Sequence, residues 1–346
     1  MEPGQPTDTP MPRELLVGQQ VVVPGRGTGT LAVENGLPNG DGTWNVDFDD
    51  STEGNVPREC VQVPDPARHA WRVITDPRSE PKIDGWTRFV CFSDTHGKHR
   101  SIPSSHIVEG DVLLHAGDFS NTGEPQQVKD LAEWLAQYPA AHKVVIAGNH
   151  DVTFHADYYK RAWERYHRVQ EDVEATRALL TGPSSPCIYL EDAATDVLGY
   201  QIYGSPWQPE FCDWAFNLEP GELAPKWAQI PRDVDILMTH GPPLGIGDKT
   251  FLGKRAGCDH LLSAVRQRPV TVHVAGHIHE GYGTVADGDV LFVNASTCTL
   301  KYKPMNKPVV FDLPPAAELR RARRPPAAPA GAAAAPQPEP VSMEFP

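Results

Sequence analysis

The stretch KVVIAGNHD, residues 143–151, decides the fold expected for this chain because an apolar, β-branched run ends abruptly in a polar cluster. Short apolar runs of this kind are typical of strands that are buried on both faces. The same pattern recurs in RFVCFSD (88–94), DVLLHAGD (111–118), VDILMTHG (234–241), TVHVAGH (271–277) and VLFVNAS (290–296). These runs alternate with stretches of helical character at 125–138, 157–180 and 259–268. The alternation predicts an α/β domain whose sheets lie between helices.

Polar clusters end five of these runs, and all of them offer nitrogen or oxygen ligands. In chain order they are Asp94-Thr95-His96, Gly117-Asp118, Gly148-Asn149-His150-Asp151, Thr239-His240-Gly241 and Gly276-His277-Ile278-His279. Loops at strand ends converge on one edge of such a sheet, so we expect the clusters to share one pocket. Imidazole, carboxylate and amide ligands without sulfur suit Mn, Fe, Zn or Co, and this many histidines disfavour calcium.

Each cluster taken singly also has a purely structural interpretation. An Asp-x-His sequence caps turns, and a Gly-Asp pair is an ordinary turn. Within an extended chain, however, residues two apart leave the same face, so Asp94 with His96, or His277 with His279, can reach a common ion. Five such clusters at five strand ends predict a metal site better than they predict five separate turns.

The ordered set D-x-H, GD, GNHD, H and GHxH resembles the calcineurin-like metallophosphoesterase superfamily over roughly residues 89–296. The segments GSPWQP (204–209), THGPPLG (239–245) and GHIHEGYG (276–283) are similar to the metallophosphoesterase-domain-containing proteins of animals, which belong with the class III cyclic nucleotide phosphodiesterases. The resemblance implies a two-sheet αββα sandwich. It also implies two divalent transition-metal ions, with Mn²⁺ first and Fe, Zn or Co as alternatives.

The resemblance further implies a role for each site residue. One ion would be held by Asp94, His96 and His279, the other by Asn149, His240 and His277, and Asp118 would bridge the two. A hydroxide between two such ions attacks a phosphoester in line. His150 is expected to stabilise the transition state or protonate the leaving oxygen, with Asp151 orienting it. A loop-stabilising link is the alternative role for Asp151.

The substrate expected from this resemblance is a small phosphodiester, such as a 3′,5′- or 2′,3′-cyclic nucleotide. Trp207 and Tyr282 lie in the similar segments and are candidates to contact a nucleobase, with Trp207 the first choice. A phosphomonoesterase, a phosphoprotein phosphatase and a non-catalytic binding protein are the alternatives. The chain has 31 Lys plus Arg against 45 Asp plus Glu, a formal charge of -14, which argues against binding extended nucleic acid.

Composition changes along the chain predict its domain organisation. Disordered ends are expected at 1–12 and in the Pro/Ala-rich segment 314–346, a linker at 66–86, and the phosphoesterase domain at 87–313. Residues 13–65 carry short alternating runs and the turn NGDG, which predict a small all-β barrel similar to SH3 and Tudor modules. Such a barrel is expected to bind a protein or peptide partner. Trp44 and Phe48 would then bind a methylated side chain, or would simply pack the small core.

Cysteine usage and hydropathy predict where the protein resides. The six cysteines form no CxxC pair, so we expect reduced, buried thiols rather than a zinc clip or a redox site. A cationic leader and an apolar run of about 18 residues are both missing, which predicts a cytoplasmic protein with no membrane partner.

Overall fold

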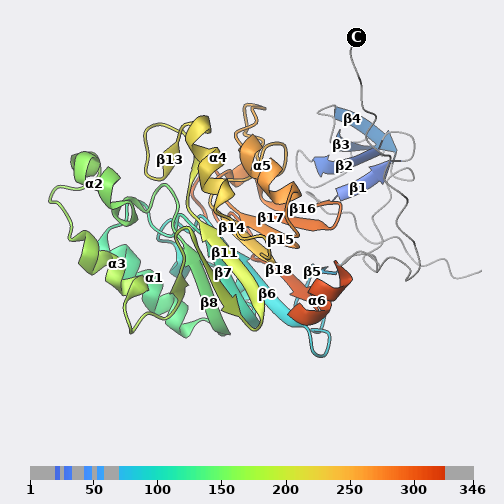
Figure 1. The fold of residues 1–346 in the computed structure, drawn as a ribbon, viewed down its shortest axis with the longest axis horizontal. Helices are drawn as coiled ribbons and strands as arrows, with labels where there is room; N and C mark the ends of the chain where they lie inside the picture. Colours follow the sequence, from blue (N-terminus) through green and yellow to red (C-terminus); the bar gives the residue numbers. More distant parts are fainter. Residues whose placement is uncertain (1–19, 24–26, 33–42, 49–52, 58–69, 324–346) are drawn as a thin grey trace, which may run out of the picture.

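The computed structural model describes residues 20–23, 27–32, 43–48, 53–57 and 70–323. Within residues 70–323, two six-stranded sheets pack face to face between two sets of helices (Figure 1). The first sheet has the order β5 (Arg72–Ile74), β18 (Val309–Leu313), β6 (Thr87–Phe92), β7 (Gly110–Ala116), β8 (Ala140–Ile146) and β9 (Ile188–Tyr189). The second has the order β10 (Ala193–Val197), β11 (Tyr200–Ser205), β14 (Ile236–Thr239), β15 (Val272–Ala275), β17 (Val290–Asn294) and β16 (Gly283–Asp287).

Helices cover the outer face of each sheet. The first sheet packs against α1 (Pro125–Gln137), α2 (Ala156–Ala162) and α3 (Val173–Thr181). The second packs against α4 (Pro220–Ala228) and α5 (Asp259–Arg266). Figure 1 shows the two sets of helices on opposite sides of the paired sheets. The mixed α/β fold with two sheets is therefore confirmed.

Strands buried on both faces explain the continuous apolar runs of the sequence. In β7, Val112 and Leu114 lie in the layer between the sheets, whereas Leu113 faces the helices. In β14, Met238 faces inward and Leu237 packs toward α4 and α5. Strands β6, β7 and β8 are mutually parallel, as are β11, β14, β15 and β17. Parallel pairing brings their carboxyl ends to one edge of each sheet, where the polar clusters follow.

The helical stretch expected at 157–180 is not one helix. It consists of α2, a single turn of 3-10 helix at Trp163–Arg165, an irregular segment and α3. The Tyr159 hydroxyl bonds to His167 Nδ1 at 2.5 Å and accepts the Glu171 N–H at 3.0 Å, which folds the chain back after α2. Asp172 then caps α3 by accepting the Ala175 N–H.

The ordered domain extends beyond the expected limits 87–313 at both ends. Strand β5 lies within the expected linker 66–86 and pairs antiparallel with β18. Helix α6 (Ala316–Ala322) lies within the segment 314–346, for which disorder was expected. Leu319 is fully buried in the layer between the sheets, and Arg320 and Arg323 both pair with the buried carboxylate of Asp235. These contacts correct the expected boundary for the residues of α6.

The N-terminal part of the chain contributes a separate antiparallel sheet. Its order is β1 (Gln20–Val23), β2 (Gly27–Ala32), β3 (Thr43–Phe48) and β4 (Glu53–Pro57). The closure of this sheet into a barrel and the surroundings of the Trp44 and Phe48 side chains lie outside what the structure describes, as do residues 1–12 and 324–346. The SH3/Tudor-like module stays a prediction.

Candidate metal centre

The five polar clusters meet where strands of the two sheets end. Asp94 and His96 follow β6, and Asp118 follows β7. Asn149 and His150 follow β8, His240 follows β14, and His277 and His279 follow β15. The side chains of all except His150, His277 and His279 are buried, and those three are partly exposed.

Left-handed backbone conformations direct several of these side chains toward one another. Asp94, His96, Asp118 and His277 have φ values of 52°, 43°, 51° and 65°. Each such residue costs about 1–3 kcal/mol unless the surrounding structure enforces it, and such residues gather at functional sites. Gly148 lets its loop approach the Asp118 carboxylate closely, since a Cβ at this position would lie 2.3 Å from Asp118 Oδ1. The Gly148 loop therefore packs directly against the Asp118 carboxylate.

A first ligand group consists of Asp94, His96 and His279, whose candidate ligand atoms lie within 4.8 Å of one another. His279 Nε2 lies 3.3 Å from Asp94 Oδ1 and 3.3 Å from His96 Nε2. The second His279 nitrogen, Nδ1, faces the Thr299 carbonyl at 3.2 Å. Histidines that bind metals usually donate their other ring N–H in this way. Two imidazole nitrogens directed at one point beside a carboxylate fit a divalent transition metal.

A second ligand group consists of Asn149, His240 and His277. His240 Nδ1 faces the Ala116 carbonyl at 2.8 Å, which leaves Nε2 directed into the centre, 3.1 Å from Asn149 Oδ1. The His277 and His240 rings lie 5.1 Å apart between centroids. This group also fits a metal, and again contains no sulfur.

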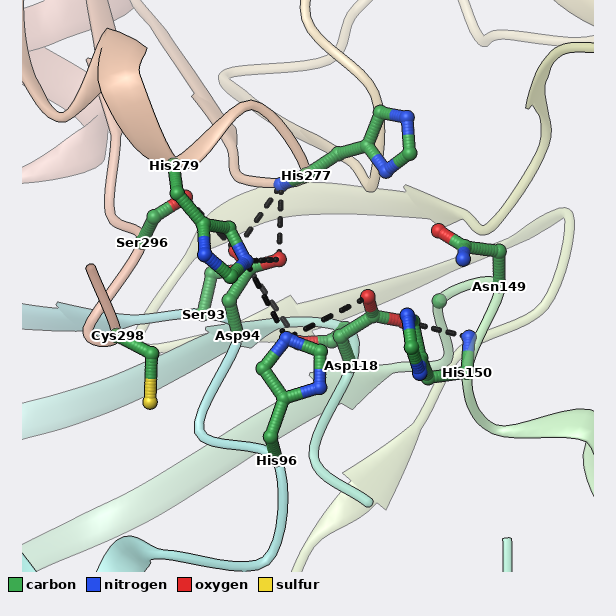
Figure 2. A network of polar contacts seen from close by, with 12 residues as sticks. Ser93, Asp94, His96, Asp118, Asn149, His150, His277, His279, Ser296 and Cys298 are labelled. Atoms are coloured by element: carbon green, nitrogen blue, oxygen red, sulfur yellow. Dashed lines mark hydrogen bonds and ion pairs between the residues drawn. The ribbon is translucent and has the colours of Figure 1, made fainter. Parts of the chain in front are cut away.

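Asp118 lies between the two ligand groups (Figure 2). Its Oδ2 is 3.3 Å from His240 Nε2 and 3.9 Å from His96 Nε2. Its Oδ1 accepts the His150 backbone N–H at 2.8 Å, which holds the carboxylate in place. The same carboxylate can therefore serve both groups.

The two carboxylates and two of the histidines shift each other's pKa values in opposite directions. Burial alone would raise the pKa of Asp94, but the hydrogen bond and charge of His279 lower it. Burial of Asp118 is likewise outweighed by His240 and His150, and its pKa falls well below the ordinary value. The partners shift in the opposite sense. Burial would lower the pKa of His240 and His279, but the carboxylates raise both to about 9.

The other two histidines of the candidate groups have lowered pKa values. Burial lowers the pKa of His96 to about 3, against the opposing charge of Asp118. Burial and the neighbouring His240 lower the pKa of His277 to about 3 as well. Each ligand group therefore combines one histidine that is protonated near neutral pH with one that is not.

The expected pairing of His150 with Asp151 is contradicted by the hydrogen bonds. His150 Nδ1 bonds to the Asn121 carbonyl at 2.9 Å. The Asp151 carboxylate accepts the Ser120 N–H, the Ser120 hydroxyl and the Gly148 N–H at 2.9, 2.6 and 2.8 Å. Asp151 thus ties together the two loops that carry Asp118 and Asn149, in line with the alternative loop-stabilising role. His150 itself lies within 4.8 Å of ligand atoms of His96 and Asp118.

Trp207 and Tyr282 are held by contacts outside the ligand groups. The Trp207 indole N–H donates to Asp192 at 2.8 Å, and the Lys226 ammonium lies over the ring at 4.1 Å. The Tyr282 hydroxyl donates to the Lys307 carbonyl at 2.9 Å, and its ring packs against the core between the sheets. In the described chain, neither ring contacts a histidine of the ligand groups.

Three other aromatic residues lie beside histidines of the centre, and sequence reasoning missed them. The Trp214 ring lies 4.2 Å from the His150 ring, and Phe211 lies 5.8 Å from His277. Tyr302 lies 4.7 Å from His96 and 5.5 Å from His279. Their sequence neighbourhoods carry no strand-end motif, so no pattern signalled them.

The fold and the candidate metal centre together define the class of the protein as a metal-dependent phosphoester hydrolase. Comparison of the sequence with known families then identifies the family of this chain. Residues 87–281 match the calcineurin-like phosphoesterase family, to which the chain belongs. It is 48% identical over 259 residues to metallophosphoesterase domain-containing protein 1 of Homo sapiens, covering 71% of this chain and 77% of the relative. The mouse protein matches equally, and a UPF0046 protein of Caenorhabditis elegans is 42% identical over 240 residues, covering 66% of this chain and 60% of the relative.

Proposed function

We propose that this protein hydrolyses small phosphodiesters, with cyclic nucleotides (3′,5′ or 2′,3′) as the preferred class. The observation that carries the proposal is the position of Asp118 between two ligand groups that each fit a divalent cation. Asp94, His96 and His279 would hold one cation, Asn149, His240 and His277 the other, and Asp118 would contact both. When bound, such a pair supplies a strong oxygen nucleophile at neutral pH and neutralises the phosphoryl oxygens.

His150 is the residue proposed to act on the phosphate directly. With Nδ1 bonded to the Asn121 carbonyl, its other nitrogen is available beside the ligand groups. A protonated imidazole there would donate to a phosphoryl oxygen or to the leaving oxygen. Trp214 packs against the ring at 4.2 Å and limits its rotation.

The scarcity of fixed cationic side chains favours a diester over a monoester. Arg100, the arginine closest in sequence to a ligand motif, is paired with Glu133 at 2.7 Å. Within the described residues, the Asp94 and Asp118 carboxylates pair only with histidines. A monoester dianion, as in a phosphoprotein, is typically bound by bidentate arginines, and these ion pairs include none.

Hydrolysis of bis-p-nitrophenyl phosphate with added manganese tests the proposal. His240→Ala and Asn149→Ala should each lower kcat/KM by more than about hundredfold, since each removes a ligand. His260→Ala is the matched control, because His260 is a half-exposed histidine of α5 that lies next to Asp259. If His240→Ala and His260→Ala behave alike, the chain acts as a binding protein and the catalytic proposal is wrong.

We further propose that the metal is manganese, that the protein is cytoplasmic, and that residues 13–65 bind a peptide partner. No helix in the described residues is long and apolar enough to cross a membrane. Metal analysis of the purified protein tests the choice of manganese, and cell fractionation tests the location. A peptide-array screen that compares the full chain with a chain lacking residues 13–65 tests the peptide partner.

A further inference from the structure

Two buried histidines, His115 in β7 and His273 in β15, belong to neither ligand group. Each is the only polar side chain of an apolar run, residues 112–116 and residues 272–275. Their strand neighbours, such as Leu114 and Val272, lie in the layer between the sheets, so both histidines point to the helix-covered faces. Burying an imidazole is unfavourable unless it is hydrogen-bonded. The partners of these two rings therefore show what the rings do.

His115 bonds to a threonine that stands between two candidate ligands. Its Nε2 lies 3.0 Å from Thr95 Oγ1, and Thr95 separates Asp94 from His96 in the loop after β6, the parallel neighbour of β7. On both sides of Thr95 the backbone is left-handed, with φ values of 52° at Asp94 and 43° at His96. Such a conformation persists only where the surrounding structure holds it, and the Thr95–His115 bond is one of the contacts that hold it.

His273 makes the equivalent bond in the second sheet, and there the direction of the hydrogen bonds is defined. Its Nε2 lies 2.8 Å from Thr239 Oγ1, and the Thr239 hydroxyl donates to the Gly241 carbonyl at 2.7 Å. Because a hydroxyl has a single proton, the His273 Nε2–H must be the donor to Thr239. The bond from Thr239 to Gly241 spans His240. These hydrogen bonds therefore hold the turn that carries this candidate ligand.

Each threonine–histidine bond also joins two strand ends that carry candidate ligands. Strand β7, which contains His115, leads directly to Asp118, and strand β15, which contains His273, leads to His277. The parallel partners β6 and β14 carry the threonines. The same device is thus present once in each sheet, beneath each of the two ligand groups.

We propose that His115 and His273 are positioning residues of the metal centre, one for each ligand group. His115 acts through Thr95 on the first group, and His273 acts through Thr239 on His240 of the second. The inference rests on the proposed function, since it assumes that the ligand groups bind cations. Hydrogen-bonded neighbours of metal ligands typically account for about 10–100-fold in metal affinity. A histidine that only packs the core would change the free energy of unfolding without acting on one group in particular.

Titration calorimetry of the full chain with manganese tests the proposal, because it reports the affinities of both sites. His273→Leu should weaken one of the two sites by about tenfold or more and leave the other within about threefold. His273→Gln keeps an N–H donor near the position of Nε2 and should restore the affinity to within about threefold of wild type. His99→Leu is the matched control, since it removes a buried histidine that packs against Trp134, and it should leave both affinities unchanged.

Ligand variants identify the group on which each histidine acts. In a His279→Ala background, which disables the first ligand group, the remaining site should be weakened by His273→Leu but not by His115→Leu. In a His240→Ala background, which disables the second, His115→Leu should weaken the remaining site and His273→Leu should have no further effect. A general loss of stability would not produce this crossed pattern.

The outcomes separate this inference from the proposed function. Equal weakening of both sites by His273→Leu, or unchanged affinities with a lower free energy of unfolding in urea, would overturn the positioning role and leave the phosphoesterase proposal standing. A loss in His273→Leu that His273→Gln does not restore would contradict the hydrogen bond as the cause. Folded wild-type protein that binds no manganese would overturn the proposed function, and this inference with it.

Discussion

Metal binding should release protons from two identified histidines. In the metal-free protein the pKa values of His240 and His279 are raised to about 9, whereas those of His96 and His277 are lowered to about 3. At pH 7 the first two carry protons that an incoming cation must displace, and the other two are already neutral ligands. Each ligand group contains one histidine of each kind.

The size of the effect follows from the distance between the pKa and the pH. Two pH units separate pH 7 from a pKa of about 9, so displacing one proton costs about 2.7 kcal/mol, or about a hundredfold in affinity. Because the proton is bound in the metal-free state, the affinity rises with pH. Each cation should bind about tenfold more tightly per pH unit between pH 6 and 8, with the increase levelling off above pH 9.

Titration calorimetry with manganese at pH 7, in two buffers of different ionisation enthalpy, counts the protons released. We expect about one proton per cation. His279→Ala should remove about one proton from the total, whereas His277→Ala, its matched control two residues away, should weaken binding without changing the count. Release of no protons by the wild-type protein, or an equal loss of protons in both variants, would refute this account of the charges.

Three further predictions concern stability and the packing of the site. Arg88→Met leaves the fully buried Asp312 carboxylate without its partner at 2.8 Å, so the free energy of unfolding in urea should fall by about 3–5 kcal/mol, and a loss below about 1 kcal/mol would contradict this. Gly276→Ala would place a Cβ 2.2 Å from Asp94 Oδ2, so bound manganese should fall sharply by metal analysis, whereas Gly221→Ala, with no atom within 4 Å, should retain it. Burial lowers the pKa of His273 to about 3, so the metal-free fold loses stability as the pH falls through 6.5. Between pH 8 and pH 5 the loss is about 2 kcal/mol; His273→Gln should abolish that part, and an unchanged pH dependence would contradict it.

The strands and the candidate ligands were predictable because they depend on short-range patterns. A strand buried on both faces needs a continuous apolar run, as in residues 143–147, and parallel strands must end at a common edge. Polar residues directly after several such runs are therefore neighbours in space, whatever the details of packing. This is why Asp94, Asp118 and His240 were predicted from their sequence positions and are brought together in the structure.

Other features were decided by contacts between segments far apart in the chain. Helix α6 looked like the start of a disordered tail, because its anchoring depends on Asp235, 85 residues away from Arg320. The stretch 157–180 carries a helical pattern, but hydrogen bonds of the Tyr159 hydroxyl turn the chain back. Local propensity is a weak prior that such tertiary contacts override.

What the sequence by itself determined about this protein is the α/β domain and the set of polar residues at its strand ends. Only the tertiary structure decided that the Asn121 carbonyl, rather than Asp151, orients His150, and that Phe211 and Tyr302, rather than Trp207, lie beside the ligand histidines. The physical reason is that strand ends are placed by periodic burial, which the chain records locally. The direction of a loop side chain depends on the strain and hydrogen bonds that distant segments impose on it, and no local pattern records these.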